Sequence, residues 1–202
     1  MSAAALLSRN PANGGYTVAD LHALPEDGPR YELIDGSIIV SPSATTDHNA
    51  IARWIAGPLE QQQPGGFVVG TDQSTTVDDN NEPRPDVTVA HARVLQMTPF
   101  PISELVLAVE VVSPKSSWLR DTETKRGLYA RAKVPSYWIV VPEQDEATIA
   151  LAELVLDDDT GQYAYRTHYT TEVFTTDTPW PITIDLPALT ERRARLIEQA
   201  RG

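Results

Sequence analysis

The segment Leu105-Val106-Leu107-Ala108-Val109-Glu110-Val111-Val112 predicts a buried β-strand that contains a single acidic residue. Apolar side chains fall on both alternating faces, a pattern typical of a central strand that is covered on both sides. Glu110 interrupts this pattern. A charged carboxylate in such a place costs roughly several kcal/mol unless a metal, a basic partner or several hydrogen-bond donors compensate it. The segment therefore predicts a covered sheet with a carboxylate that needs a partner.

Elements on either side of this strand predict a central mixed β-sheet flanked by helices, an α/β (mixed α+β) class. A helix is expected from Ser116 or Ser117 to about Ala132, and another apolar strand from Tyr137 to Val141. A strand, a helix and a strand in succession are typical of a crossover unit. The other strands expected in the sheet core are 67–69, 74–77 and 86–90.

Two hairpins and three more helices are predicted outside this core. Asp35-Gly36, between segments 31–34 and 37–40, is a strong signal for an N-terminal hairpin. The turn over 157–161 predicts a C-terminal hairpin between segments 147–156 and 162–170. The further helices are expected over 16–24 with Thr17 as its cap, from Thr45 or Thr46 to before Pro64, and over 189–199.

Length and composition limit the classes of protein. The chain has 202 residues, 41% of them hydrophobic, and we expect one domain over 1–202 with a loosely ordered N-terminus over 1–15. Cysteine is absent, which excludes disulfides, thiolate metal sites and cysteine nucleophiles. No stretch approaches the ~20 apolar residues of a membrane span, so we expect a cytoplasmic protein with no membrane partner.

The charge of the chain is strongly acidic, but one segment is basic. The formal net charge is −12, which argues against a protein that coats nucleic acid nonspecifically, because phosphate binding depends on Lys and Arg. The segment from Lys115 to Lys133 holds six basic residues against Asp121 and Glu123, a local balance of +4. Any contact with DNA is therefore expected to be local, through this helix.

Two carboxylates and a lysine form a candidate site. Asp86 begins a predicted strand directly after Pro85, and pairing of that strand with the central one directs Asp86 and Glu110 to the same place. Two carboxylates on neighbouring strands suit Mg²⁺. Lys125 falls on the helix face that meets the sheet. These three residues are the parts needed for metal-assisted phosphodiester cleavage.

Each residue also has a structural explanation. Asp86 alone is equally well explained as a turn cap beside Pro85. Glu110 and Lys125 alone are explained as a buried ion pair. Lys125 is otherwise expected to lie along the sheet edge or to pair with Asp121, four residues earlier. The combination is what favours a catalytic site.

At these positions the sequence resembles the Uma family of restriction endonucleases, a branch of the PD-(D/E)XK nuclease superfamily. The resemblance covers residues 31–186, which implies a nuclease-like core of that extent and a restriction-endonuclease-like fold. Single motifs are weak signals, but their order and spacing together are specific. The motifs are Tyr31-Glu32-Leu33-Ile34-Asp35-Gly36, Ser41-Pro42 with His48, Arg84-Pro85-Asp86-Val87, Val109-Glu110-Val111-Val112-Ser113-Pro114, Lys125 with Tyr129, and residues 134–140.

The resemblance implies a divalent-metal site, with Mg²⁺ or Mn²⁺ held by Asp86, Glu110 and the backbone carbonyl of Val111. The superfamily has a lysine two residues after the second acid, where this chain has Val112. In this family the lysine has moved to the helix, which implies that Lys125 replaces it.

Two further residues are candidates by resemblance or position. Glu32 resembles the additional upstream acid of the superfamily, although a hairpin glutamate can equally face solvent. His48 is a candidate for a phosphate contact or for fixing Glu32, and the alternative is a polar surface residue at a helix start. Tyr129 is expected to serve packing.

The leading hypothesis is an Mg²⁺-dependent DNA endonuclease that acts as a two-fold homodimer. A nuclease-like binding or assembly module with a structural Glu110–Lys125 pair is the alternative, motivated by Val112. A glycosidase is weaker, because an inward lysine keeps neighbouring acids ionised and works against acid catalysis.

Overall fold

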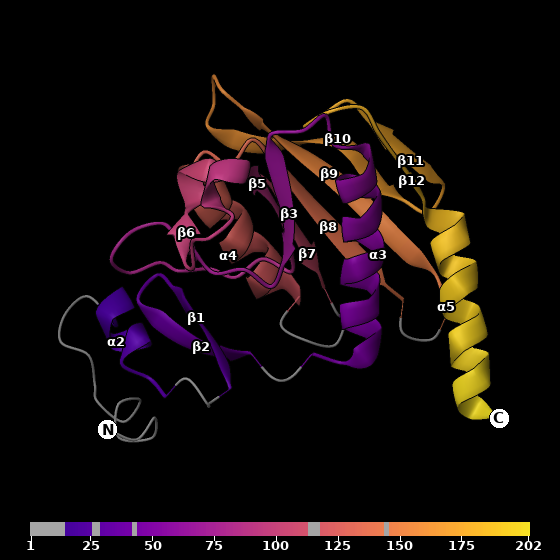
Figure 1. Ribbon diagram of the computed structural model, residues 1–202, viewed down its shortest axis with the longest axis horizontal. Coiled ribbons are helices and arrows are strands. Elements are labelled where there is room, and N and C mark those ends of the chain that lie inside the picture. Colours follow the sequence, from indigo (N-terminus) through magenta and orange to yellow (C-terminus); the bar gives the residue numbers. More distant parts are fainter. Residues whose placement is uncertain (1–14, 26–28, 42–43, 113–117, 144–145) are drawn as a thin grey trace.

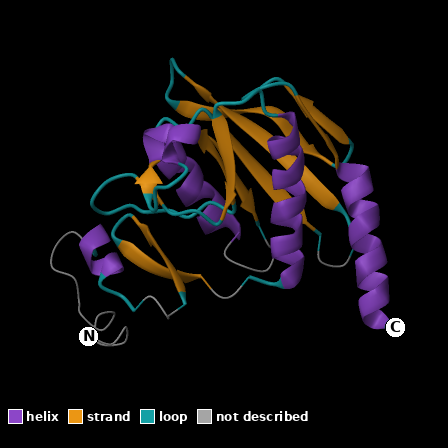
Figure 2. Ribbon diagram, in the orientation of Figure 1, coloured by secondary structure: helices purple, strands orange, loops and turns teal. Residues whose placement is uncertain are grey.

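The computed structural model describes residues 15–25, 29–41, 44–112, 118–143 and 146–202. Its centre is a six-stranded sheet in the order β10-β9-β8-β7-β5-β3, with helices packed on it (Figures 1 and 2). Only β7 and β8 are parallel, and the other neighbours are antiparallel, so the sheet is mixed as predicted. The strands are β3 (Phe67–Thr71), β5 (Val87–His91), β7 (Leu105–Val111), β8 (Ser136–Pro142), β9 (Ile149–Asp157) and β10 (Gln162–Thr170).

Helices on both faces bury the central strand. Helix α4 (Trp118–Arg131) connects the parallel strands β7 and β8, which confirms the predicted crossover unit. Val109 packs in the core that includes α3 (Thr46–Gln62), whereas Ala108 packs in the core that includes Tyr129 of α4. The apolar run of β7 is therefore explained by burial on both sides.

An N-terminal unit of one short helix and one hairpin lies beside this sheet (Figure 1). Helix α2 (Val18–His22) begins at Thr17, whose hydroxyl accepts a hydrogen bond from the Asp20 N–H. Strands β1 (Arg30–Ile34) and β2 (Ser37–Ser41) pair around Asp35-Gly36, where both residues have positive φ. Two backbone hydrogen bonds between Leu33 and Glu82 attach the hairpin to the rest of the chain.

The C-terminal part is a second hairpin followed by a helix. Strand β11 (Val173–Thr176) pairs with β12 (Ile182–Asp185), and α5 (Leu186–Arg201) follows directly, capped by the Asp185 carboxylate. Arg193 of α5 is only 5% exposed. Its guanidinium binds the Asp47 carboxylate of α3 and the backbone carbonyl of Glu143, so it ties three elements together.

Three predictions about elements were wrong in part. Segment 74–77 is not in the main sheet, because β4 (Thr75–Thr76) pairs only with β6 (Phe100–Pro101). The predicted C-terminal hairpin is present but forms β9 and β10 of the main sheet, and the separate hairpin β11–β12 was not predicted. Helix α5 begins at Leu186 rather than 189. Two single-turn helices, η1 (Ala92–Val94) and η2 (Ile102–Glu104), complete the description.

Some predictions stay open. The expected loose start over 1–14 and the expected helix start at Ser116 or Ser117 lie outside the described residues. The single domain over 1–202 and the core over 31–186 stay predictions. Within the described ranges, none of the helices is long and apolar enough to cross a membrane.

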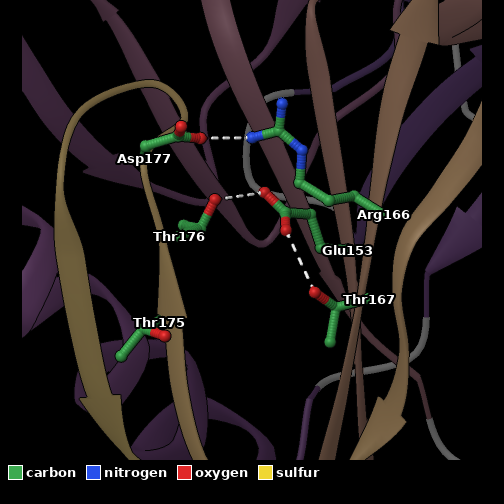
Figure 3. A pocket seen from close by; sticks show the side chains of 6 residues that line it. All are labelled: Glu153, Arg166, Thr167, Thr175, Thr176 and Asp177. Carbon is green, nitrogen blue, oxygen red and sulfur yellow. Dashed lines mark hydrogen bonds and ion pairs between the residues drawn. The ribbon is translucent and has the colours of Figure 1, made fainter.

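A shallow polar groove lies between β9, β10 and the β11–β12 hairpin (Figure 3). Glu153 of β9 is fully buried beside it. Its carboxylate accepts hydrogen bonds from the hydroxyls of Thr176 (2.6 Å) and Thr167 (3.3 Å), whereas Arg166 pairs with Asp177. Burial raises the pKa of Glu153, against the lowering effect of the Thr176 hydrogen bond and of Arg166.

This raised pKa predicts how Glu153→Gln changes stability. The folded state holds the Glu153 proton to higher pH than the unfolded state does, so the free energy of unfolding falls as pH rises above the ordinary pKa of glutamate. An amide does not titrate and can still pair with both hydroxyls. Thermal melts should therefore show that the melting temperature of the variant minus that of the parent rises as pH increases from about 4.5 to about 7.5. A difference that stays constant or falls over that range contradicts the prediction.

Candidate active site

The register of the sheet brings Asp86 opposite Glu110. Strands β5 and β7 are antiparallel, and the pair Val87–Val109 ends their ladder. Asp86 directly precedes Val87 and Glu110 directly follows Val109, so the register directs the two acids to the same place. Residues directly opposite each other share a face, with Cβ atoms roughly 5 Å apart. The two acids therefore stand together at the end of the sheet where the parallel strands β7 and β8 finish.

Two donors hold the Asp86 carboxylate. One oxygen accepts a hydrogen bond from the backbone N–H of Val111 at 2.7 Å, and the other lies 2.9 Å from Nε2 of His48. His48 stands in the first turn of α3, where the Thr45 cap holds its backbone N–H. The start of α3 is thus joined to the ends of two central strands through one carboxylate.

Two other donors hold the Glu110 carboxylate from α4. The Tyr129 hydroxyl donates to it at 2.7 Å, and the Lys125 ammonium lies 3.0 Å away. Lys125 and Tyr129 are four residues apart and so project from the same side of the helix. Glu110 itself is only 6% exposed. The buried acid predicted from the sequence therefore has both a basic partner and a neutral donor.

Glu32 completes the cluster from the N-terminal hairpin. Its carboxylate lies 3.2 Å from the Lys125 ammonium, and the residue is 7% exposed. The solvent-facing alternative for Glu32 is therefore wrong. One ammonium thus joins three elements that are far apart in the sequence, namely β1, β7 and α4.

The charges of the site change the acid–base behaviour of Glu110 and Lys125. Burial raises the pKa of Glu110 to about 8, with a further rise from Asp86 and Glu32, although the Lys125 ammonium acts in the opposite direction. Burial alone would lower the pKa of Lys125, but Glu110 and Glu32 outweigh it and raise the pKa well above its usual range. This rise favours the ammonium form of Lys125 in the site.

His48 and Tyr129 are also affected. The hydrogen bond to Asp86 raises the pKa of His48, although burial opposes the rise. Burial and the Glu110 carboxylate raise the pKa of the Tyr129 hydroxyl well above its usual value, so it stays a donor. The cluster thus contains three acids facing one fixed cation and one histidine, an arrangement that favours an added positive charge.

The donor atoms fit a hard divalent cation. Asp86 and Glu110 offer carboxylate oxygens side by side, and Val111 follows directly with a backbone carbonyl. Among the described residues, no three His, Asp or Glu side chains are grouped to hold a metal. A cation here would therefore rely on two carboxylates, a backbone oxygen and water, a mixture typical of Mg²⁺.

Other expectations need correction. His48 contacts Asp86 and not Glu32, so the proposed role in fixing Glu32 is wrong. Tyr129 is not only packing, because its hydroxyl binds Glu110. The predicted Lys125–Asp121 pair falls on a side chain outside the described ones, and Lys125 contacts Glu32 and Glu110 instead.

The basic helix is less available than its composition predicts. Lys125 is buried in the site, Arg126 donates to the backbone carbonyl of Tyr163, and Arg131 pairs with Asp35. Three of the four basic residues of α4 therefore have partners within the protein, and the side chain of the fourth, Arg120, lies outside the described ones.

Comparisons with known proteins agree with this architecture. A solved structure from Anabaena variabilis ATCC 29413, described as "a putative nuclease belonging to DUF820", superposes with a TM-score of 0.62 at 17% identity, and the match covers 86% of this chain and 98% of that chain. At that identity the likeness shows a shared fold. No curated protein matches the chain. The model of the Uma2 family, whose description is "Putative restriction endonuclease", matches residues 18–174. Because this match spans most of the 202 residues, the chain belongs to the Uma2 family.

Proposed function

We propose that the protein is a metal-dependent endonuclease that hydrolyses DNA phosphodiester bonds, with Mg²⁺ or Mn²⁺ bound by Asp86, Glu110 and the Val111 carbonyl. The observation that carries the proposal is that Asp86 and Glu110 meet at one end of the sheet, where the Asp86 carboxylate binds the Val111 N–H next to Glu110 and the Lys125 ammonium contacts Glu110. The family description and the shared nuclease fold support the same reaction class.

The bound cation would polarise the scissile phosphate and acidify a water molecule. The chain's own groups do the rest. His48 and the Val111 N–H hold the Asp86 carboxylate, and Tyr129 holds Glu110, so that both acids are oriented before substrate arrives. Lys125 supplies a permanent positive charge that stabilises the phosphate as water adds to phosphorus and one P–O bond breaks.

A second candidate has one observation in its favour. Lys125 lies between Glu32 and Glu110 at ion-pair distance from both, which suits a structural role in a binding or assembly module without catalysis. Calorimetric titration with Mn²⁺ separates the two candidates, because only the nuclease requires saturable binding that depends on Asp86.

Removal of either proposed ligand should abolish both metal binding and cleavage. Asp86→Asn and Glu110→Gln keep the side-chain volume but replace a carboxylate by an amide. We expect Mn²⁺ affinity, measured by calorimetry, to fall by more than ~10–100-fold, the loss typical when a residue that only hydrogen-bonds to a metal ligand is replaced. Plasmid cleavage should be lost.

Glu153→Gln is the matched control, because Glu153 is also a buried acid but lies beside the groove between β9, β10 and the β11–β12 hairpin. It should leave Mn²⁺ affinity and cleavage as in the parent. Ligand variants that bind Mn²⁺ and cut plasmid as the parent does would refute the assignment, as would a parent that never binds the metal.

Two tyrosines test whether the Glu110 carboxylate must be held in place. Tyr129→Phe removes the hydroxyl that donates to Glu110, so we expect Mn²⁺ affinity to fall by about 10-fold or more. Tyr137→Phe is the control, because its ring packs 5.3 Å from that of Tyr129 and its buried hydroxyl has no hydrogen-bond partner in the described part of the chain. Equal affinities for the two variants would contradict this role of Tyr129.

A further inference from the structure

Strand β10 forms one edge of the central sheet and carries a group of exposed rings. Tyr165 is 37% exposed and Tyr169 is 41% exposed, and His168 is exposed between them. Large rings normally avoid water, and most others in the described chain are buried. We call Tyr165, His168 and Tyr169 the β10 ring cluster.

The rings of this cluster are held in place by one another and by α4. The rings of Tyr165 and His168 are stacked, with centroids 4.9 Å apart and planes 16° apart. The guanidinium of Arg126 lies over the Tyr165 ring at 5.4 Å. Tyr169 belongs to the group because it lies beside His168 in the bulge between Thr167 and Thr170. Partial burial and the Tyr165 phenol raise the pKa of Tyr169 to about 12.

The ring cluster on β10 and Glu110 on β7 lie at the same height along their strands. Thr167 pairs with Glu153 and Thr170 with Leu151, so the two residues between them, His168 and Tyr169, stand opposite Ala152 in a bulge. Ala152 pairs with Ile139, which pairs with Glu110. Three strand spacings, roughly 14 Å, therefore separate the cluster from Glu110.

The cluster also lies on the same side of the sheet as the site. Glu110 faces α4, because its carboxylate binds Lys125 and Tyr129 of that helix. Tyr165 faces α4 as well, since Arg126 of α4 lies over its ring. The rings and the Glu110 carboxylate therefore lie on the same side of the sheet, the side that α4 covers.

The local charge and backbone favour a nucleic-acid ligand over another protein strand. Segment 162–170 contains no Asp or Glu, in a chain of net charge −12. Arg166 of this segment pairs with Asp177, so the cation that faces the rings is Arg126. Two register shifts interrupt the pairing of β10, and a bulged edge is a poor template for an added strand. Exposed rings beside arginine are typical of surfaces on which unpaired bases stack.

We infer that the β10 ring cluster is a stacking platform for unpaired bases of a single DNA strand that leads to the candidate active site. This inference rests on the proposed function for the nature of the ligand. The rings supply affinity through stacking rather than through phosphate contacts, which suits an acidic protein.

The test is fluorescence anisotropy with labelled dT20 in EDTA, so that no metal contributes and no cleavage occurs. We expect Tyr169→Ala and His168→Ala each to weaken dT20 binding by about fivefold or more, the loss of one stacked base. Tyr169→Phe should bind as the parent does, because stacking needs the ring and not the hydroxyl. The slope of log Kd against log salt should stay unchanged in the alanine variants, since no phosphate contact is removed.

Val173→Ala and Leu196→Ala are matched controls, because they remove exposed apolar side chains elsewhere, on β11 and α5. Alanine variants of the cluster that bind dT20 like the parent would overturn the inference, and so would an equal loss in the controls. A change of oligomeric state in the cluster variants, seen by light scattering, would instead identify the surface as a contact between copies. A parent that binds dT20 but cuts no DNA with Mn²⁺ would overturn the proposed function and leave the platform standing.

Discussion

The buried Glu110 carboxylate is the constraint on which the site depends. It stands in a central strand that is covered on both faces, where an uncompensated negative charge is strongly unfavourable. Lys125 and Tyr129 provide the compensation, and both come from the helix that connects the two parallel strands. The same ammonium also binds Glu32 on strand β1 of the N-terminal hairpin. Compensation of the buried Glu110 charge thus connects α4 and the two-stranded sheet β1–β2 to the site.

Compensation of Glu110 is incomplete, and this is what makes the cluster suitable for a cation. Asp86 and Glu32 add negative charge around the same point, and the pKa of Glu110 stays raised despite its lysine. A stable structural ion pair would be expected to balance its charges, whereas this group has acids in excess. The imbalance also agrees with an acidic chain in which Lys125, Arg126 and Arg131 of α4 bind other groups of the protein. Under the proposed function, a bound metal and stacked bases, rather than a basic surface, would provide the affinity for DNA.

Much of this arrangement could be predicted from the sequence, because it follows from local patterns. An acid inside an apolar run marks Glu110, and a predicted strand that begins at Asp86 brings the two acids together if the strands pair. Helical spacing places Lys125 on the side that faces the sheet. The hairpin at Asp35-Gly36 could also be predicted, because Asp-Gly favours tight turns in which both central residues have positive φ. Both residues do have positive φ in the structure.

The parts that could not be predicted depend on contacts between distant segments. The partner of His48 is Asp86, 38 residues away, and nothing in the spacing distinguishes this acid from Glu32. The hydrogen bond from the Tyr129 hydroxyl to Glu110 could not be predicted either, because a tyrosine on the inner face of a helix usually indicates packing. One signal was available, since Tyr129 lies four residues after the inward Lys125 and so shares its side of α4. Segment 74–77 contains the β-branched residues that are common in strands, but its strand β4 pairs with β6 and not with the main sheet.

A crystal of the protein soaked in Mn²⁺ and measured for anomalous scattering tests the central claim most directly. The account predicts one strong anomalous peak at coordination distance, roughly 2.0–2.2 Å, from carboxylate oxygens of both Asp86 and Glu110 and from the Val111 carbonyl. A peak that contacts neither acid, or a fully soaked crystal with no peak between them, would contradict it.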